Sequence, residues 1–196
     1  MQTTFGREMN SLQLYRAVGT LTRAFRDDPL PRLIAPDPAH RTPMMRAVFA
    51  YNIRCAREAG GVIVSSPRFE GVAVWMRSES SPSAPERELR RIPAGALARL
   101  IEMSRALDEA RLDAADGKEH IYLSALGVLP GFRGRGIATA LLNTVKSEAA
   151  RENRAVYLET VAPSNLAYYE KRGFAVVSEI SLEGTRCFLM RTQSPA

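Results

Sequence analysis

The feature that most constrains the fold of this chain is a strand, helix and strand pattern between residues 120 and 160. The segment HIYLSALGVLP (120–130) is almost continuously apolar, which is typical of a central strand in a sheet covered on both faces. GFRGRG (131–136) interrupts it, and apolar residues then recur at every fourth position, which predicts a helix from about Gly134 to Asn153. AVYLET (155–160) predicts a second buried strand, and a right-handed crossover makes the two strands parallel.

The segments before this unit predict two helices joined by irregular chain. We expect an opening helix within residues 12–25, because Asp27-Asp28-Pro29 is a strong stop signal. The prolines at 29, 31, 36 and 38 predict irregular structure directly after it. A second helix is expected over residues 44–53, closed by Gly60-Gly61.

Two hairpins and further helices complete the expected elements. Short β-branched runs at 61–66 and 71–77 predict antiparallel strands, followed by a locally disordered loop at 78–85. Residues 89–112 predict a solvated helix or helix pair with one apolar stripe. Ser164 can cap a short helix that runs to Arg172 and ends at Gly173, and residues 174–182 and 185–191 predict a closing hairpin.

Length and composition favour one ordinary globular domain over residues 1–196. No apolar run approaches the ~18 residues of a membrane span, and the first residues lack a secretory pattern, so we expect a cytoplasmic protein without membrane contact. Cys55 and Cys187 stand alone and predict reduced, half-buried thiols instead of a zinc site or a disulfide. With only His40 and His120 in addition, we expect no metal.

The chain carries a formal net charge of +6, and its basic residues are interleaved with acids. A nucleic-acid-binding module would need a clustered basic face, so we treat it as a minor hypothesis. A mildly positive balance also suits a small polyanionic cofactor.

The most informative local motif is Arg133-Gly134-Arg135-Gly136-Ile137-Ala138, between the buried strand and the amphipathic helix. Free amides at the start of a helix favour phosphate, and glycines let the backbone approach an anion closely. A tight strand-to-helix turn without a ligand is the alternative interpretation. The spacing fits neither GxxxxGK[ST] of nucleoside triphosphate sites nor the GxGxxG of dinucleotide sites.

The pattern from Val128 and Pro130 through Arg133, Gly136 and Ala138 resembles the acyl-CoA pyrophosphate motif of the GNAT superfamily of N-acyltransferases. A second run, from Asn165 through Tyr169-Glu170 to Gly173-Phe174, resembles the later motif of that family at its usual distance. The stretch AFRDDPLPRLIAPDPAHR is similar to the puromycin N-acetyltransferase-like subgroup.

This resemblance implies a mixed α/β fold with a mostly antiparallel sheet of six to seven strands, a splayed central parallel pair and helices on both faces. It also implies acetyl-CoA in the cleft between the splayed strands, transferring its acetyl group to a primary amine. The residues that it places at the cofactor are Leu126, Gly127, Val128, Arg133, Gly134, Arg135, Gly136, Ile137, Ala138, Asn165 and Tyr169. Gly127 by itself also suggests a β-bulge that leaves an amide free.

Tyr169 is the residue that we expect to act as general acid, because a phenol with a reference pKa of about 10 keeps its proton at neutral pH. Tyr168 is expected to pack, and packing is also the alternative interpretation of Tyr169. The general base is left open by the motif. Glu159, at the end of the second buried strand, is our candidate, and His120 is the next one to test.

The expected function is therefore N-acetylation of a primary amine, with a small molecule as the expected acceptor. Aminoglycoside-like or nucleoside antibiotics, polyamines and protein amines all stay open as acceptors. An acyl-CoA-binding sensor or partner module without turnover is the alternative function. A homodimer is the default expectation for the assembly.

Overall fold

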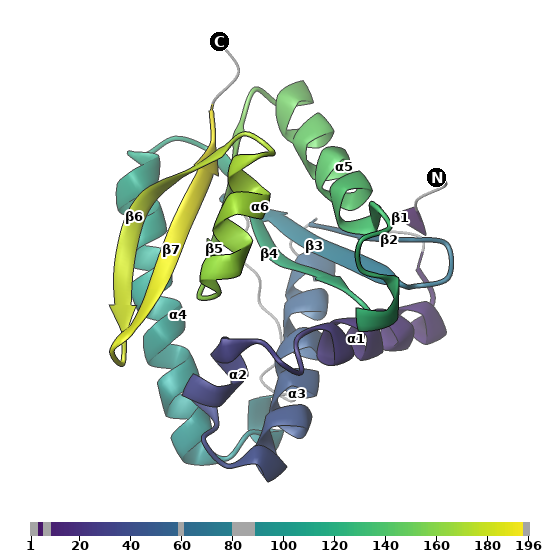
Figure 1. Cartoon of the computed structure of the whole chain (residues 1–196), viewed down its shortest axis with the longest axis vertical. Helices are drawn as coiled ribbons and strands as arrows, with labels where there is room; N and C mark the ends of the chain where they lie inside the picture. The colour runs from purple at the N-terminus through teal and green to yellow at the C-terminus, as the bar shows by residue number, and fades with distance from the viewer. Residues whose placement is uncertain (1–3, 6–8, 59–60, 80–88, 194–196) are drawn as a thin grey trace.

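The computed structural model describes residues 4–5, 9–58, 61–79 and 89–193, and these form one seven-stranded sheet with helices on both faces (Figure 1). The strand order is β1-β2-β3-β4-β5-β7-β6. The strands are β1 (Thr4–Phe5), β2 (Val62–Ser65), β3 (Gly71–Arg77), β4 (His120–Val128), β5 (Ala155–Thr160), β6 (Phe174–Leu182) and β7 (Thr185–Thr192). Only β4 and β5 pair in parallel among these strands, as the crossover pattern predicted.

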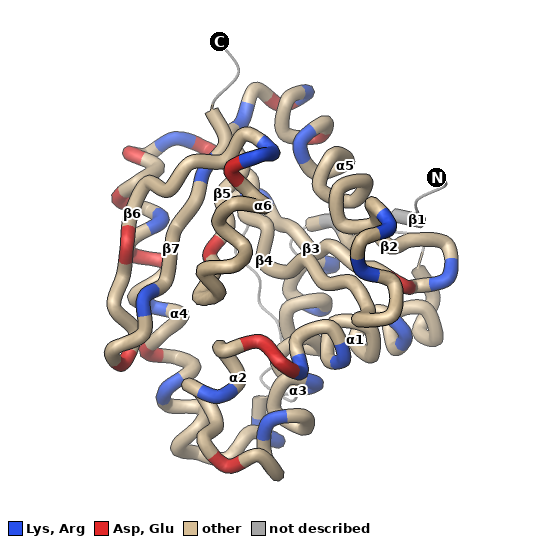
Figure 2. Tube along the Cα trace, viewed as in Figure 1, with Lys and Arg blue, Asp and Glu red and all other residues tan. Residues whose placement is uncertain are grey.

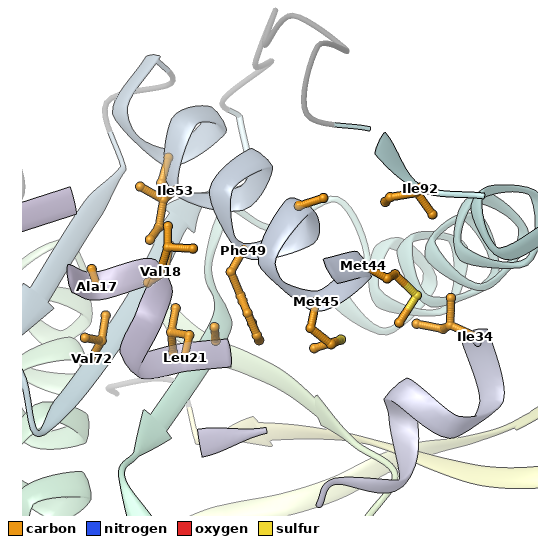
Figure 3. Packing of buried hydrophobic residues seen from close by; sticks show 14 of the residues in the cluster. Ala17, Val18, Leu21, Ile34, Met44, Met45, Phe49, Ile53, Val72 and Ile92 are labelled. Carbon is orange, nitrogen blue, oxygen red and sulfur yellow. The ribbon is translucent and has the colours of Figure 1, made fainter. Parts of the chain in front are cut away.

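The helices divide between the two faces of the sheet. They are α1 (Ser11–Ala24), α2 (Pro29–Ile34), α3 (Pro38–Glu58), α4 (Ala94–Ala115), α5 (Ile137–Arg151) and α6 (Leu166–Glu170). One apolar cluster joins α1, α3 and α4 to one face, with Leu21, Phe49 and Val72 among its members. Figure 3 shows how the side chains of α1 and α3 meet in this cluster. A second cluster joins α5 and α6 to the opposite face.

The prediction of irregular chain across the prolines was wrong, because α2 begins at Pro29 and α3 begins at Pro38. Proline is tolerated in the first turn of a helix, where its missing N–H would have no intrahelical partner. The Asp28 side chain caps α2 by accepting from the Leu30 amide at 3.0 Å. The second helix is longer than expected, since it begins at Pro38, and Pro43 lies inside it.

Other expected features lie elsewhere or fall outside the described residues. Most of the loop predicted at 78–85 lies outside the described residues, and so does Gly60, which was predicted to end the second helix. The short strand β1 had no signal in the sequence. Cys55 and Cys187 are fully buried free thiols instead of half-buried ones, at 3% and 1% exposure. The prediction of one apolar stripe on α4 was wrong in part, because Ile101 and Leu112 are exposed.

The β-bulge that was predicted at Gly127 lies at Ser124 instead. Gly127 is in regular register with Val72, and the register shift that β4 makes against β3 leaves Ser124 as the extra residue. Gly127 has a different role, because a Cβ there would lie 2.9 Å from the Ala24 Cβ and 3.0 Å from the Leu21 Cδ2. The missing side chain therefore allows α1 to pack directly on β4.

Replacing Gly127 by alanine should consequently push α1 away from the sheet. Overpacking of this kind costs about 1–3 kcal/mol, and we expect Gly127→Ala to lower the free energy of unfolding in urea by that amount. Gly131→Ala is the matched control, because a Cβ at Gly131 meets nothing within 4 Å. Equal stabilities of the two variants would show that the packing of α1 on β4 is not tight.

Candidate functional site

The candidate site begins where β4 and β5 separate. Their parallel register covers only His120 with Ala155, Ile121 with Val156, and Tyr122 with Tyr157. Beyond this point β4 continues to pair with β3, while β5 continues to pair with β7. The two strands therefore diverge within one sheet, and the edge of β4 from residue 123 onward has no register partner in β5. Figure 1 shows this divergence toward the carboxyl ends of both strands.

The bulge at Ser124 accompanies the divergence. Because a β-bulge increases the local twist of its strand, it turns the rest of β4 away from β5. The Ser124 hydroxyl donates to the Val74 carbonyl at 3.1 Å, which holds the bulge on the β3 side. The open edge of β4 presents backbone N–H and C=O groups that can bind an extended ligand, as unpaired strand edges do.

The glycine loop follows β4 directly. Gly134 and Gly136 both adopt left-handed φ angles of 75°, and a Cβ at either position would project into open space. Gly136 is the N-cap of α5 and provides no side-chain cap, so the first amides of this 15-residue helix have no capping side chain. Ile137 and Ala138 stand in that first turn. The loop therefore presents free N–H groups at the positive end of a helix dipole, an arrangement that favours phosphate.

The two arginines of the loop point to different partners. The Arg133 guanidinium donates to the Ala24 carbonyl at the end of α1, at 2.9 Å. The Arg135 guanidinium lies over the Phe132 ring, 5.1 Å from its centroid. Arg133 thus ties the glycine loop to α1 in this structure, whereas the exposed Arg135 side chain stays beside the loop.

The short helix α6 carries the second predicted group of site residues. The Asn165 side chain donates to the Thr160 hydroxyl at 3.1 Å and so fixes the start of α6 to the end of β5. Asn165 also stands at the N-cap position that was expected for Ser164, which lies one residue earlier in a 3-10 turn. The helix α6 ends at Glu170, two residues before the predicted Arg172, and Gly173, with a φ of 84°, ends the turn that follows it.

The two neighbouring tyrosines of α6 have different surroundings. Tyr168 packs under Arg172, whose guanidinium lies 3.6 Å from the ring centroid, and its hydroxyl lies 3.5 Å from the Thr139 hydroxyl. The Tyr169 ring meets Phe174 edge-on at 5.6 Å. Its hydroxyl has no hydrogen-bond partner among the described residues. Burial is the main cause that raises the pKa of Tyr169, so this phenol stays protonated over the working pH range of most enzymes.

A carboxylate that sequence reasoning did not select lies near Tyr169. Asp28, between α1 and α2, is close enough for its charge to raise the pKa of Tyr169, behind the effects of burial and of Tyr168. Burial raises the pKa of Asp28 itself, while the Leu30 amide and the Arg133 charge act in the opposite direction. Figure 2 shows this acidic segment between α1 and α2. The Asp-Asp-Pro run was interpreted only as a helix stop. The same run was the available signal in the sequence for a carboxylate near the site.

Glu159 lies on the other face of the sheet, toward α4. Its side chain is only 7% exposed, and its Oε1 lies 3.1 Å from Nη1 of Arg111 in α4. Tyr122 adds a hydrogen bond to Glu159, and the Arg111 guanidinium stacks 3.9 Å from the Tyr122 ring centroid. Burial raises the pKa of Glu159, with Arg111 and Tyr122 opposing it. This triad joins β4, β5 and α4 at the point of divergence.

His120 and Trp75 are both buried. His120 is buried at the far end of β4 from the glycine loop, and its Nδ1 lies 3.0 Å from the Lys118 carbonyl. Trp75 is a core residue on β3. Within the described part of the chain no group of His, Cys, Asp and Glu is arranged to hold a metal ion, and no helix there is long and apolar enough to span a membrane.

Comparison with known proteins defines the class of this fold. A mosquito arylalkylamine N-acetyltransferase-like protein, 5b, aligns with a TM-score of 0.70 at 13% identity, over 97% of this chain and 99% of its own. Arylalkylamine N-acetyltransferase 2 of Aedes aegypti aligns with a TM-score of 0.65 at 14% identity, over 99% of each chain. A Corynebacterium glutamicum protein described as histone acetyltransferase HPA2 and related acetyltransferase aligns with a TM-score of 0.66 at 21% identity. This alignment covers 100% of this chain and 98% of the other.

These likenesses show that the chain has an N-acetyltransferase fold. Residues 95–174 match the model of the acetyltransferase (GNAT) family, and this segment contains β4, the glycine loop, α5, β5 and α6. The segment that contains the candidate site is thus similar to the GNAT acetyltransferases. Proteins of that family use acetyl-CoA.

The residues of this chain fit that cofactor. The uncapped first turn of α5 and the open space at Gly134 and Gly136 provide a cradle for a pyrophosphate. The unpaired edge of β4 provides backbone partners for an amide-containing chain such as pantetheine.

Replacing Gly136 by valine should therefore remove acetyl-CoA binding. A side chain at this position fills the cradle, and we expect the dissociation constant from calorimetry to rise by at least ~10-fold, equivalent to ~1.4 kcal/mol. Gly184→Val is the matched control for backbone strain, because Gly184 has a φ of 80° and open space in the β6–β7 turn. If both variants fold and bind acetyl-CoA equally well, the phosphate site is not at this loop.

Proposed function

We propose that the protein is an acetyl-CoA-dependent N-acetyltransferase that acetylates a small primary amine. The observation that carries this proposal is that the β4–β5 pairing ends at Tyr122 and Tyr157, so that β4 continues with an open edge toward the uncapped glycine loop. One end of the resulting cleft suits a pyrophosphate and the other suits an extended chain with amide groups. Acetyl-CoA supplies the acetyl thioester, and the protein's own groups hold it and move protons.

In the proposed reaction, the residues of the chain act from the two faces of the sheet. Tyr169 is on the α5 and α6 face, and its hydroxyl donates a hydrogen bond to the departing sulfur. Because a thiol has a reference pKa of about 8.5, below the raised pKa of Tyr169, this hydroxyl stabilises the sulfur chiefly as a hydrogen-bond donor. Gly127 and Leu129 point their amides toward β3, so the Val128 amide on the open edge of β4 is the proposed partner of the carbonyl oxygen.

The acceptor must lose a proton before its nitrogen forms the amide bond. Glu159 is the proposed proton acceptor, directly or through water, because it stands at the divergence on the face opposite Tyr169. Asp28 is a second carboxylate within electrostatic range of the site. Its segment places negative charge beside the cleft, and this charge suits an ammonium group (Figure 2).

Support for a small acceptor comes from the arylalkylamine N-acetyltransferases with the same fold. The similarity of residues 24–41 to puromycin N-acetyltransferase-like proteins adds nucleoside amines as a second class. Release of free thiol from acetyl-CoA across a panel of arylalkylamines, nucleoside amines, polyamines and peptides tests the proposal. Binding of acetyl-CoA without turnover on any amine would favour the sensor function instead.

Removal of the Tyr169 hydroxyl should slow turnover strongly. Tyr169→Phe keeps the ring that packs on Phe174, so we expect kcat to fall by about 10²-fold or more with little change in stability. Tyr168→Phe is the matched control, since that hydroxyl faces Thr139 of α5. Full turnover by Tyr169→Phe, or equal losses in the two variants, would make Tyr169 a packing residue.

The pH dependence of kcat/KM should identify the proton acceptor. Because a base works only when ionised, the rate should rise as the pH rises through the raised pKa of Glu159. We expect Glu159→Gln to lose this acidic limb and Asp28→Asn to retain it. If Asp28→Asn loses the limb and Glu159→Gln retains it, the carboxylate between α1 and α2 takes the proton, and Glu159 serves only to pair with Arg111.

A further inference from the structure

A cavity that contains none of the residues of the glycine loop lies between α1 and α3. Its volume is about 650 Å³, within the range of ~300–1,000 Å³ that is typical of small-molecule pockets. Each helix presents one face to it, because the lining positions recur at intervals of three and four residues. The lining residues are Ser11, Leu14, Tyr15 and Val18 of α1, Pro43, Arg46, Ala47, Ala50, Ile53, Arg54, Arg57 and Glu58 of α3, and Arg91. We call this cavity the α1–α3 groove.

The floor of the α1–α3 groove is apolar. Val18 of α1 lies beside Ile53 of α3, as Figure 3 shows. Ala47 and Ala50 have small side chains, so α3 leaves depth between the helices at these positions. Tyr15 lines the groove although 61% of it is exposed, and a large exposed aromatic residue beside an apolar floor is typical of binding sites.

The rim of the α1–α3 groove is basic. Four of its lining residues are arginines and one is a glutamate, which gives a formal charge of 4 − 1 = +3. The Arg46 guanidinium lies 4.7 Å from the centroid of the Tyr15 ring, so a charged and an aromatic group stand together at the opening. Figure 2 shows blue segments along α3. An arrangement of this kind complements a flat apolar body that carries negative charge.

The α1–α3 groove is separate from the proposed acetyl-CoA cleft. The proposed cleft adjoins the carboxyl end of α1 at Ala24, whereas the groove adjoins α1 from Ser11 to Val18. Six residues of helix at 1.5 Å per residue place Val18 and Ala24 ~9 Å apart. None of the residues proposed for the cofactor or for proton transfer lines the groove.

We propose that the α1–α3 groove is a second binding site, for a small molecule with an aromatic or other apolar body and an anionic group. The apolar body lies on Val18, Ala50 and Ile53, and the anionic group pairs with the arginines of the rim. Carboxylates, sulfonates and phosphates share this chemistry, because all accept charge-assisted hydrogen bonds from guanidinium groups.

The test uses the aromatic sulfonate 8-anilinonaphthalene-1-sulfonate with the full chain saturated in CoA, so that the cleft is filled. N-phenyl-1-naphthylamine, which has a similar body and no charge, is the parallel probe. We expect the double variant Arg46→Gln and Arg57→Gln to weaken binding of the sulfonate by about 10-fold or more, and binding of the uncharged probe by less than about 3-fold. Arg68→Gln with Arg151→Gln is the control, since it changes the net charge equally at exposed positions outside the groove.

Three results would overturn the proposal. Equal sulfonate binding by the two double variants would show that the rim arginines do not bind the anion. Sulfonate binding that occurs without CoA and is lost when CoA is added to saturation would place the probe in the cleft. A wild-type dimer in sedimentation that becomes monomeric only in the groove variant would make a second copy of the chain the occupant. Acetyl transfer should be retained in both double variants, so failure here is distinct from failure of the proposed function.

Discussion

The short parallel pairing of β4 and β5 is the constraint on which the rest of the site depends. Three register pairs hold the strands together at one end, and different partners separate them at the other, β3 for β4 and β7 for β5. A sheet that continued to pair here would satisfy every backbone group and leave no place for a ligand. The bulge at Ser124 bends β4 at the point where the pairing ends, so the open edge is built into the strand itself.

The remaining groups of the site are positioned by that divergence. The glycine loop and α5 follow the free end of β4, and α6 follows the free end of β5, where Asn165 bonds to Thr160. Arg133 then links the loop to the carboxyl end of α1, next to the acidic segment that contains Asp28. Three chain segments that are distant in sequence thus meet at the proposed cofactor site. On the opposite face, Arg111 neutralises Glu159, because a buried carboxylate without a partner would be costly.

Much of this arrangement could be predicted from the sequence, because the signals were local. Short-range patterns predicted three features. These are the apolar run of β4, the apolar residues at every fourth position of α5, and the turn at Gly173. The reason for Gly127 could not be predicted, since it depends on how closely α1 packs on β4. The partner of Glu159 was also hidden, because Arg111 is 48 residues away in sequence. Pro29 and Pro38 were misinterpreted for a local reason, since proline breaks a helix interior but suits a first turn.

Hydrogen exchange of backbone amides, with and without CoA, tests the central claim most directly. CoA in the cleft should slow exchange in two segments, the loop and first turn of α5 at residues 134–139 and the open edge of β4 at residues 123–128. Protection in the α1–α3 groove is not expected from CoA. If CoA binds and these two segments exchange at unchanged rates while other segments are protected, the divergence of β4 and β5 is not the cofactor site.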